Sequence, residues 1–545
     1  MQSRTPAPRA DVCVVGAGPA GALVAHRLAS AGHDVVVLEA GPRFNFEDRP
    51  EQMERAIRPA HDDLSVWGMG GERDEFSTGG EQFYPLNRTR VKGVGGSTLH
   101  WQGMVMRLHE RDFSGGLPNG DPAWPIDYED LRPYYADVES AFGVAGASDN
   151  PFAPPRERPH PMAAFAPSYS DSLFAPACER LGITTHSVPN ARNSEGYDDR
   201  SPCVGYGTCQ PVCPSGAKYS ADHHIAKAEA AGARVIDRAP VQRLDTAGEN
   251  GDRIEAATYG TPDGTEHRQE ARQFVLAAGG IEIPRLLLLS RSTDHPDGLA
   301  NSSGAVGRYF MEHLFAGAGG TLDEQTRQNH VGFITSESHQ FYDDPGQAVE
   351  RDGETIVPAV DGPLSPIKLE FLNYAGPSPV EQALNAASWG DDLLADLRAS
   401  YGHHIAMGGL VGQPPRAENR ITLDTDTTDD HGTPVPEIHW SWGDRVRRTI
   451  ERANRIQHAV LDELGVDIGW TAGPESTGPA YHHMGTTRMG TDPSASVVDP
   501  TLRTHDVENC WIASSSVFPT AGSMNPTLTI GALALRCADR LAERL

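Results

Sequence analysis

The chain has 545 residues, more than one hydrophobic core usually supports, so we expect at least two domains. Its formal net charge of −28 disfavours binding to nucleic acid or to an anionic membrane surface. The only lysines among its 46 basic residues are Lys92, Lys218, Lys227 and Lys368. The negative charges of such a chain repel one another in dilute buffer, and high salt screens this repulsion. The composition therefore predicts a halophilic protein, with an ordinary acidic enzyme as the alternative.

Two further properties of the sequence limit the class of protein. No stretch approaches the roughly 20 apolar residues that span a bilayer, and the first ten residues lack the apolar region of an export signal. We therefore expect no membrane span and, from this chain alone, a cytoplasmic location. Seven cysteines are too few and too unevenly spaced for a disulfide scaffold. Four of them stand alone and are expected to be small core residues: Cys13, Cys178, Cys510 and Cys537.

The N-terminal 41 residues predict a strand, a glycine turn, a helix and a second strand. An apolar run at 11–15 leads directly into GAGPAG, and ALVAHRLASAG and DVVVLEAG follow. Gly16 permits a tight turn, Gly18 lets the backbone approach a pyrophosphate, and Gly21 allows the helix to pack closely. Glu39 stands near the position of a carboxylate that binds ribose hydroxyls. The unit predicts dinucleotide binding but does not separate FAD from NAD.

A second glycine-rich loop, KGVGGSTLHW, follows a polar segment (44–90) to which we assign no chemistry. Gly95, Gly96 and Ser97 can turn backbone amides toward a cofactor. The motif GGSTLHW resembles the flavin-contacting loop of the glucose-methanol-choline (GMC) oxidoreductases. In pyranose-oxidase-like members a histidine at this spacing is bonded covalently to the flavin, and His100 occupies it. Two interpretations stay open for His100, covalent attachment and packing beside the ring.

Three clustered cysteines, Cys203, Cys209 and Cys213, lie in the loop CVGYGTCQPVCP. Three thiolates on a Gly- and Pro-rich loop can converge on one centre, and the closing CxxxCP matches the end of the bacterial ferredoxin run. Zinc normally takes four ligands, and no fourth cysteine is near, although His223 and His224 follow. A [3Fe-4S] cluster needs three cysteines and is the favoured interpretation; zinc, a disulfide and inert thiols are the alternatives. The spacing also resembles that of FAD-dependent glucose and fructose dehydrogenase catalytic subunits, where such a cluster takes electrons from the flavin.

The middle of the chain predicts further strands of a cofactor domain and then a different domain. ARVIDRAPVQRL predicts a strand near the adenine, with Val241 as the contact. FVLAAGGIEIPRLLLLS predicts a strand, turn and helix and resembles the second GMC signature, which implies a flavin contact at Ala278, although Ile283-Pro284 stands where Ser-Pro is usual. Beyond it, HVGFITS, IKLEFLNYAG, HHIAMGGLVG, RITLDTD and EIHWSW predict strands before an amphipathic helix at 450–464. An antiparallel sheet backed by helices is expected.

The chemistry is expected near the C-terminus. Oxidising an alcohol with flavin requires a base for the hydroxyl proton, and neutral histidine suits this role. The sequence YHHMGT resembles the family's Tyr-His-x-x-Gly-Thr motif, which implies that His482 is the base and His483 the runner-up. Without the resemblance, a His-His pair is more often structural or metal-binding. WIASSSVF between His482 and Asn525 predicts a buried strand ending at the site, with Ser514 implied as a cofactor contact.

Asn525, Pro526 and Thr527 open the last predicted helix. Asparagine is a good N-cap and proline a favoured first residue, so capping alone would explain this motif. The resemblance implies a second role, because the family places a histidine or asparagine here to hydrogen-bond the substrate oxygen. The start of the helix also supplies positive potential for a reduced flavin, and Pro526 and Thr527 are expected to contact the cofactor.

The chain is identified as a member of the GMC family: an α/β protein with a Rossmann-like FAD-binding domain and an antiparallel-sheet substrate domain. We expect the FAD-binding domain at 8–110, 200–313 and 476–545, a wrapping segment at 111–199 and the substrate domain at 314–475. The resemblance implies an FAD-dependent dehydrogenase of a sugar or polyol that passes electrons through the cluster to a cytochrome or quinone. It also implies a small accessory subunit, which can carry an export signal. An oxidase that uses oxygen and has structural cysteines is the alternative, and a non-catalytic flavoprotein is a third.

Overall fold

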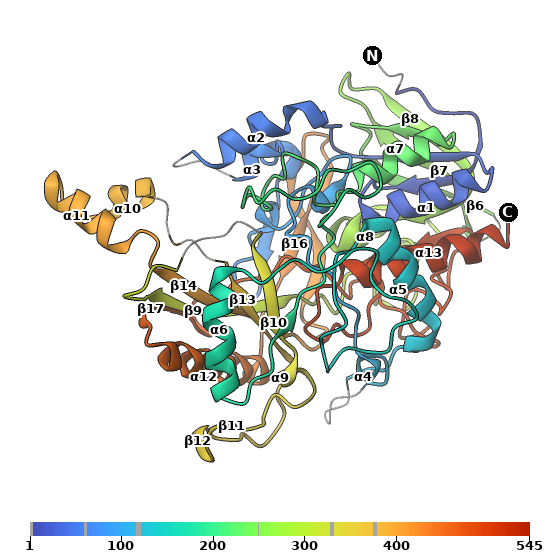
Figure 1. Ribbon diagram of the computed structural model, residues 1–545. Coiled ribbons are helices and arrows are strands. Elements are labelled where there is room, and N and C mark those ends of the chain that lie inside the picture. Colours follow the sequence, from blue (N-terminus) through green and yellow to red (C-terminus); the bar gives the residue numbers. More distant parts are fainter. Residues whose placement is uncertain are drawn as a thin grey trace.

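The computed structural model describes residues 4–58, 63–115, 121–248, 250–326, 332–373, 376 and 379–545. Two large sheets organise these residues. In Figure 1 the sheet that contains β6, β7 and β8 lies on the right with both chain ends, and the sheet that contains β9, β13 and β14 lies to the left. This arrangement agrees with the expected α/β fold of two dissimilar halves.

The first sheet has seven strands in the order β5-β2-β1-β8-β7-β6, with β18 paired to β8. Its strand β8 serves two purposes: residues 271–276 pair in parallel with β1, whereas residues 266–270 pair antiparallel with β7. The apolar runs predicted at 11–15 and 34–41 form the buried parallel pair at its centre. The strands of this sheet are β1 (Ala10–Val15), β2 (Val35–Leu38), β5 (Arg234–Ile236), β6 (Val241–Ala247), β7 (Arg253–Gly260), β8 (Glu266–Leu276) and β18 (Cys510–Ile512).

The second sheet has six strands in the order β17-β9-β14-β13-β10-β4. The long amphipathic helix α12 packs on β9 and β14, as its apolar spacing predicts, and its face toward the sheet is buried. A three-stranded sheet, β15-β16-β3, and a hairpin, β11-β12, complete the strands. Their bounds are β3 (Ser77–Gly79), β4 (His186–Ser187), β9 (His313–Thr321), β10 (Ile334–Ser338), β11 (Val349–Arg351), β12 (Glu354–Val357), β13 (Ile367–Leu372), β14 (His404–Gly412), β15 (Arg420–Thr428), β16 (Pro434–His439) and β17 (Asp467–Ala472).

Helices cover both sheets and link them. The first helix, α1, packs against α7 and α13, while α5 packs against α13 and α6 against α12. The segment 111–199 therefore places one helix on each half of the molecule. The described α-helices are α1 (Pro19–Ser30), α2 (Arg49–Ala56), α3 (Asp63–Val66), α4 (Glu110–Phe113), α5 (Tyr128–Phe142), α6 (Tyr169–Arg180), α7 (Asp222–Ala230), α8 (Gly279–Leu289), α9 (Gln340–Asp343), α10 (Pro379–Asn385), α11 (Asp391–Ser400), α12 (Asp444–Leu464) and α13 (Thr527–Ala542).

Three predicted strands differ from the structure. ARVIDRAPVQRL forms two strands, β5 and β6, because the chain turns at 237–240 between them. WIASSSVF contributes only β18, since the Ser514 hydroxyl accepts from the amide of Ser516 and starts a short 3-10 helix, η5 (Ser515–Val517). HVGFITS begins at 330–331, which lies outside the described residues, and β10 starts only at Ile334.

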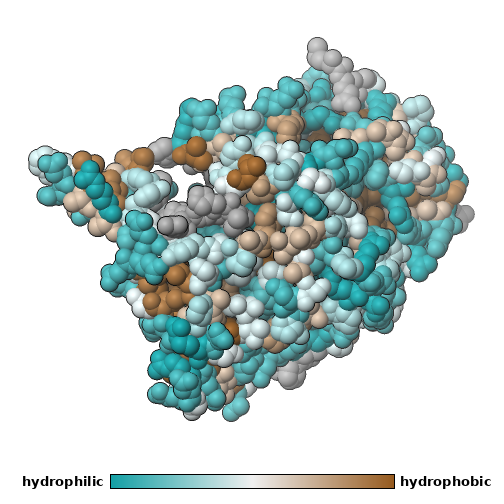
Figure 2. Space-filling model, viewed as in Figure 1, coloured by the Kyte–Doolittle hydropathy of each residue, from teal (hydrophilic) through white to brown (hydrophobic). Residues whose placement is uncertain are grey.

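The surface is mainly hydrophilic, with scattered apolar side chains (Figure 2). The helices α10 and α11 project from the body in Figure 1 and carry exposed apolar residues, among them Leu384 and Leu394. Within the part of the chain that the structure describes, no helix combines the length and apolar character needed to cross a bilayer.

Candidate active site

One cavity of about 590 Å³ lies between the two sheets and contains most of the predicted site. Its size is in the ordinary range for cofactor and ligand sites. The predicted residues that line it are Gly16, Gly18, Glu39, Gly96, Ser97, His100, Val241, Ala278, His482, Ser514, Asn525, Pro526 and Thr527. Gly21, Gly95 and the three clustered cysteines do not line it.

The glycine turn lines the cavity. Gly16 has a φ of +105°, and a Cβ there would lie 2.7 Å from the carbonyl oxygen of Ala277. A Cβ on Gly21 would lie 2.0 Å from the carbonyl oxygen of Gly16, so this glycine lets α1 pack on the turn. Glu39 accepts hydrogen bonds from the amides of Ala17 and Gly41, at 2.8 and 2.9 Å. These contacts pin the carboxylate beside the turn, where it can face a ribose, and burial raises its pKa.

The second glycine loop lies against the first. A Cβ on Gly96 would lie 2.8 Å from Cα of Gly18, so the two loops approach more closely than side chains would allow. Gly95 has a φ of +110° and starts the 3-10 helix η4 (Gly96–Leu99). The His100 ring lies parallel to the Tyr481 ring, with centroids 6.4 Å apart. Burial and the Lys218 ammonium lower the pKa of His100 to about 3, so the ring is neutral.

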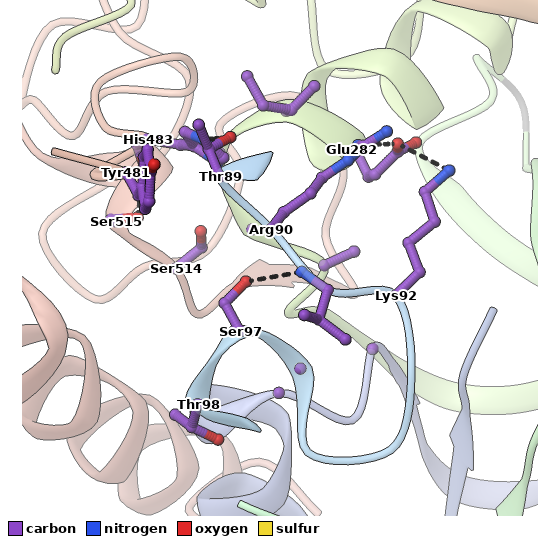
Figure 3. Close-up of a pocket in the computed structure, with 18 of the residues that line it drawn as sticks. Thr89, Arg90, Lys92, Ser97, Thr98, Glu282, Tyr481, His483, Ser514 and Ser515 are labelled. Atoms are coloured by element: carbon purple, nitrogen blue, oxygen red, sulfur yellow. Dashed lines mark hydrogen bonds and ion pairs between the residues drawn. The ribbon is translucent and has the colours of Figure 1, made fainter. Parts of the chain in front are cut away.

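His482 also lines the cavity and is held by two groups that the sequence did not reveal. Its Nδ1 lies 2.9 Å from Nδ1 of His313, and its amide donates to Oε1 of Glu312 at 2.6 Å. Burial lowers the pKa of His482 well below its usual value, with a further contribution from His313, so the imidazole is neutral. The neighbour His483 is engaged elsewhere, with Nε2 2.8 Å from the Thr89 hydroxyl. Figure 3 shows His483 and Thr89 side by side.

Glu312 and His313 precede and begin strand β9, in the sequence VGRYFMEH. Glu312 is fully buried, and it accepts from the Tyr84 hydroxyl and from the amides of His482 and His313. Burial raises its pKa to about 8. The only sequence signal for this pair was its family-like context, because the contact with His482 joins residues 170 positions apart.

Asn525 also lines the cavity, and its side chain does not cap the last helix. Helix α13 begins at Thr527 with Pro526, not Asn525, at its N-cap, and no side-chain bond caps it there. The Asn525 Oδ1 instead accepts a hydrogen bond of 2.7 Å from Nζ of Lys368, a fully buried residue of β13. Helix capping by the Asn525 side chain therefore does not explain the Asn-Pro-Thr motif.

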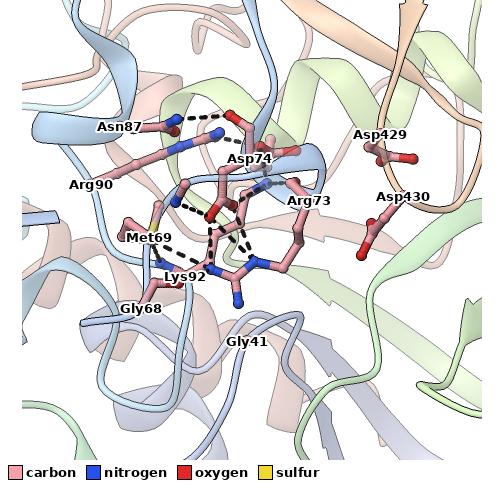
Figure 4. Close-up of polar contacts among 12 residues, drawn as sticks. Gly41, Gly68, Met69, Arg73, Asp74, Asn87, Arg90, Lys92, Asp429 and Asp430 are labelled. Atoms are coloured by element: carbon pink, nitrogen blue, oxygen red, sulfur yellow. Dashed lines mark hydrogen bonds and ion pairs between the residues drawn. The ribbon is translucent and has the colours of Figure 1, made fainter. Parts of the chain in front are cut away.

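A group of charged residues forms another wall of the cavity. Asp74 has no exposed surface and is paired with Arg73 at 2.7 Å and with Lys92 at 3.3 Å (Figure 4). Lys92 and Arg90 also converge on Glu282, as Figure 3 shows. Arg73, Asp74 and Arg90 belong to the segment 44–90, to which the sequence analysis assigned no chemistry. Nothing in the poorly periodic sequence of this segment indicated that it reaches the cavity.

The cysteine loop lies beside the flavin-loop candidate. Nζ of Lys218 donates to the carbonyl oxygens of Leu99 and Cys209, at 3.1 and 2.6 Å, and so ties the two loops together. The amide of Lys218 donates to Sγ of Cys213 at 3.4 Å, and Arg192 Nη1 lies 3.9 Å from Sγ of Cys209. These donors favour anionic sulfur. Gln210, between the cysteines, lines the cavity.

The geometry of the loop disfavours zinc. The sulfurs of Cys203, Cys209 and Cys213 do not all lie within 4.8 Å of one another, whereas ligands about 2.3 Å from one zinc ion do. The candidate fourth ligands are occupied: His223 pairs with Asp198 at 2.9 Å, and His224 contacts the Tyr219 hydroxyl at 3.1 Å.

Comparison with known proteins identifies the chain. Models of the GMC oxidoreductase family match residues 78–315 and 415–534, and a model of FAD dependent oxidoreductases matches 11–48. The fructose dehydrogenase large subunit of Gluconobacter japonicus is 33% identical over 98% of each chain. The chain belongs to the GMC oxidoreductase family. It is thus an FAD-dependent oxidoreductase that acts on CH-OH groups of alcohol or sugar-type substrates.

Two other GMC relatives extend the comparison. The 2-methyl-1,2-propanediol dehydrogenase of Mycolicibacterium austroafricanum is 30% identical over 99% of this chain and 96% of its own. The crystal structure of pyridoxine 4-oxidase from Mesorbium loti superimposes with a TM-score of 0.66 at 18% identity, over 98% of this chain and 99% of that one. The second likeness supports the GMC fold alone.

Proposed function

We propose that this GMC protein dehydrogenates a CH-OH group of a sugar or polyol, with His482 as the base and Asn525 as the hydrogen-bonding partner of the substrate oxygen. The observation that supports this most strongly is that both residues line one cavity with the glycine turn. The names of two relatives, a fructose dehydrogenase subunit and a propanediol dehydrogenase, agree with the proposed substrate class.

The chain's residues divide the reaction as follows. Neutral His482 accepts the hydroxyl proton, because burial keeps its pKa well below 6.5. The Asn525 amide donates to the oxygen as it becomes a carbonyl, and the start of α13 adds positive potential. Bound FAD would supply the acceptor for the hydride. Glu39 and the glycines at 16, 18 and 96 would hold that cofactor.

His100 is proposed as a cofactor contact, and acid precipitation tests the nature of that contact. Yellow colour that stays with the precipitated protein and is lost in His100→Ala identifies a covalent bond. Release of all flavin into the supernatant identifies packing alone. The domain boundaries given above from the sequence belong to the same proposal.

We further propose that Cys203, Cys209 and Cys213 ligate a [3Fe-4S] cluster, which would supply a one-electron path to a cytochrome or quinone. The support is the loop's contact with the flavin-loop candidate through Lys218 and the donors around its sulfurs. The printed name of the Gluconobacter relative includes a large subunit. A small partner subunit, and export with it, are part of the proposal.

An oxidase that returns electrons to oxygen is the second candidate, favoured by two relatives named 6'''-hydroxyparomomycin C oxidase and paromamine 6'-oxidase, which are 29% and 28% identical over 98% of this chain. Visible and EPR spectra of natively purified protein report flavin and cluster together, and a screen of hexoses and polyols for anaerobic flavin bleaching identifies the substrate. Peroxide formed in air at the rate of substrate oxidation would favour the oxidase.

His482→Ala tests the catalytic assignment. We expect flavin to stay bound while its reduction by substrate slows by about 10²- to 10⁴-fold, the usual contribution of a general base. His458→Ala, which removes a half-buried imidazole of α12 that contacts the Thr471 hydroxyl outside the cavity, is the matched control. Loss of the flavin itself, or unchanged reduction, would contradict the assignment.

A further inference from the structure

Lys368 occupies an unusual position for a cation. It has no exposed surface and lies in β13, within the six-stranded sheet. Only four of the chain's 46 basic residues are lysines, and this one occupies a fully buried position that a compact ammonium fits. Burying an ammonium is costly unless it is fully paired.

Two carboxylates pair with this ammonium. Nζ lies 2.8 Å from Oε1 of Glu370 and 3.4 Å from Oε2 of Glu337. Glu337 is fully buried, which by itself would raise its pKa, but Lys368 and His339 hold the pKa down to about 2. Glu337 is therefore ionised, and Lys368 compensates its charge.

The surroundings of Glu337 could also suggest a metal site. Among the described residues, His186, Glu337 and His339 form the one group of three potential ligands whose donor atoms all lie within 4.8 Å of one another. Their hydrogen bonds argue against a metal. Oδ1 of Asn150 accepts from the amide of Phe152, so its Nδ2 donates to Nδ1 of His339 at 3.0 Å. The His339 proton is then on Nε2, 2.7 Å from Glu337, and the lone pair that a metal needs is absent.

The remaining contact of Lys368 defines the orientation of Asn525. An ammonium has three donors and no acceptor, so the atom 2.7 Å from Nζ is the amide oxygen. The two N–H donors of Asn525 then belong to the other atom, Nδ2. Asn525 lines the cavity and makes no capping bond, so these donors are available to a ligand.

We propose that Lys368 is a positioning residue that fixes the Asn525 amide with its N–H donors toward the oxygen of the alcohol being oxidised. The inference rests on the proposed function of Asn525. With the ammonium removed, the amide can rotate by half a turn and present its oxygen, which repels the substrate oxygen.

A double-mutant cycle tests this proposal. The rate constant of anaerobic flavin reduction at saturating substrate is measured for wild type, Lys368→Met, Asn525→Ala and the double variant, with the sugar or polyol that bleaches the flavin fastest in the screen above. We expect each single variant to be slower by about 10- to 100-fold and the double variant to be no slower than Asn525→Ala. Effects that multiply in the double variant would overturn the proposal.

A second readout does not depend on turnover. Isothermal titration of the same substrate into pre-reduced enzyme measures binding alone, and Lys368→Met and Asn525→Ala should weaken it equally. Lys368→Gln keeps a hydrogen-bond donor without the charge, so it should bind and react nearly as well as wild type. If Lys368→Gln is as slow as Lys368→Met, the effect of Lys368 comes from its charge and not from the orientation of Asn525.

Controls separate the possible failures. If Lys368→Met does not retain FAD, the double-mutant cycle is repeated with Glu370→Gln present in all four proteins. This change removes one of the carboxylates that Lys368→Met leaves without a cation. Lys227→Met, which breaks a pair with Asp198 outside the cavity, should leave the rate unchanged. Wild-type rates in Asn525→Ala would refute the proposed role of Asn525, whereas a slow Asn525→Ala with a fast Lys368→Met would refute the positioning role alone.

Discussion

His482 and His313 face each other with their Nδ1 atoms 2.9 Å apart. Only one of the two atoms can carry the shared proton. The proposed role of His482 requires the shared proton on its own Nδ1, because Nε2 of His482 then keeps a free lone pair to act as the base.

Replacing His313 tests this assignment. His313→Ala removes the acceptor for Nδ1–H, so His482 can take the other tautomer and turn its ring. We expect flavin reduction to slow by about 10²-fold with flavin still bound, a typical cost of a misplaced catalytic group. His313→Asn, which retains an acceptor, should recover part of the rate. Equal rates in wild type and His313→Ala would show that the imidazole pair is not required.

The clustered cysteines can be tested separately from the flavin. Cys209→Ser should lose iron and the transfer of electrons to an external acceptor but keep bound FAD and its reduction by substrate. Iron analysis and EPR measure the first effect, and anaerobic bleaching measures the second. Cys178→Ala changes a buried thiol of α6 and should retain all iron. Unchanged iron in Cys209→Ser would rule out its assignment as a ligand.

Glu312 predicts a pH dependence of stability. Burial raises its pKa from 4.5 to about 8, so the folded state holds this proton at pH values where the unfolded chain has lost it. The stabilisation is complete below pH 4.5 and declines as pH rises toward 8, by up to about 1.4 kcal/mol per pH unit. Glu312→Gln lacks the titration, and urea unfolding of both proteins at pH 5 to 8 measures the difference. Parallel profiles would mean that Glu312 is ionised when folded.

Salt should stabilise the protein. The charge of −28 produces self-repulsion that a Debye length of about 3 Å at 1 M salt screens almost completely. We expect the urea midpoint and the melting temperature to rise from 0.1 to 2 M KCl, the latter by about 5 °C or more. The four lysines are consistent with this prediction, because none is fully exposed: the side chains of Lys92 and Lys227 are 12% and 32% exposed, and Lys218 and Lys368 are buried. A melting temperature independent of salt would contradict a halophilic surface.

Local patterns in the sequence were sufficient to predict the fold of the glycine turn. The turn at Gly16, Gly18 and Gly21 depends on backbone conformation and close approach, which glycine spacing encodes directly within one strand-turn-helix unit. The long helix α12 followed from its apolar spacing for the same reason. His482 and Asn525 were predicted as site residues because their motifs resemble those of the GMC family. The comparisons confirm the family, and the roles of these two residues stay predictions.

Pairings between distant segments were not available from local pattern. Residues as far apart as Lys368 and Asn525, or His313 and His482, meet only because two different sheets close on one cavity. The strand at WIASSSVF was overestimated because a serine hydroxyl competed with the backbone for its amide. The sequence by itself determined the family, the glycine turn and the reactive side-chain types. The tertiary structure decided their protonation and orientation, because burial and hydrogen-bond partners set both, and the partners lie 157 to 170 residues away along the chain.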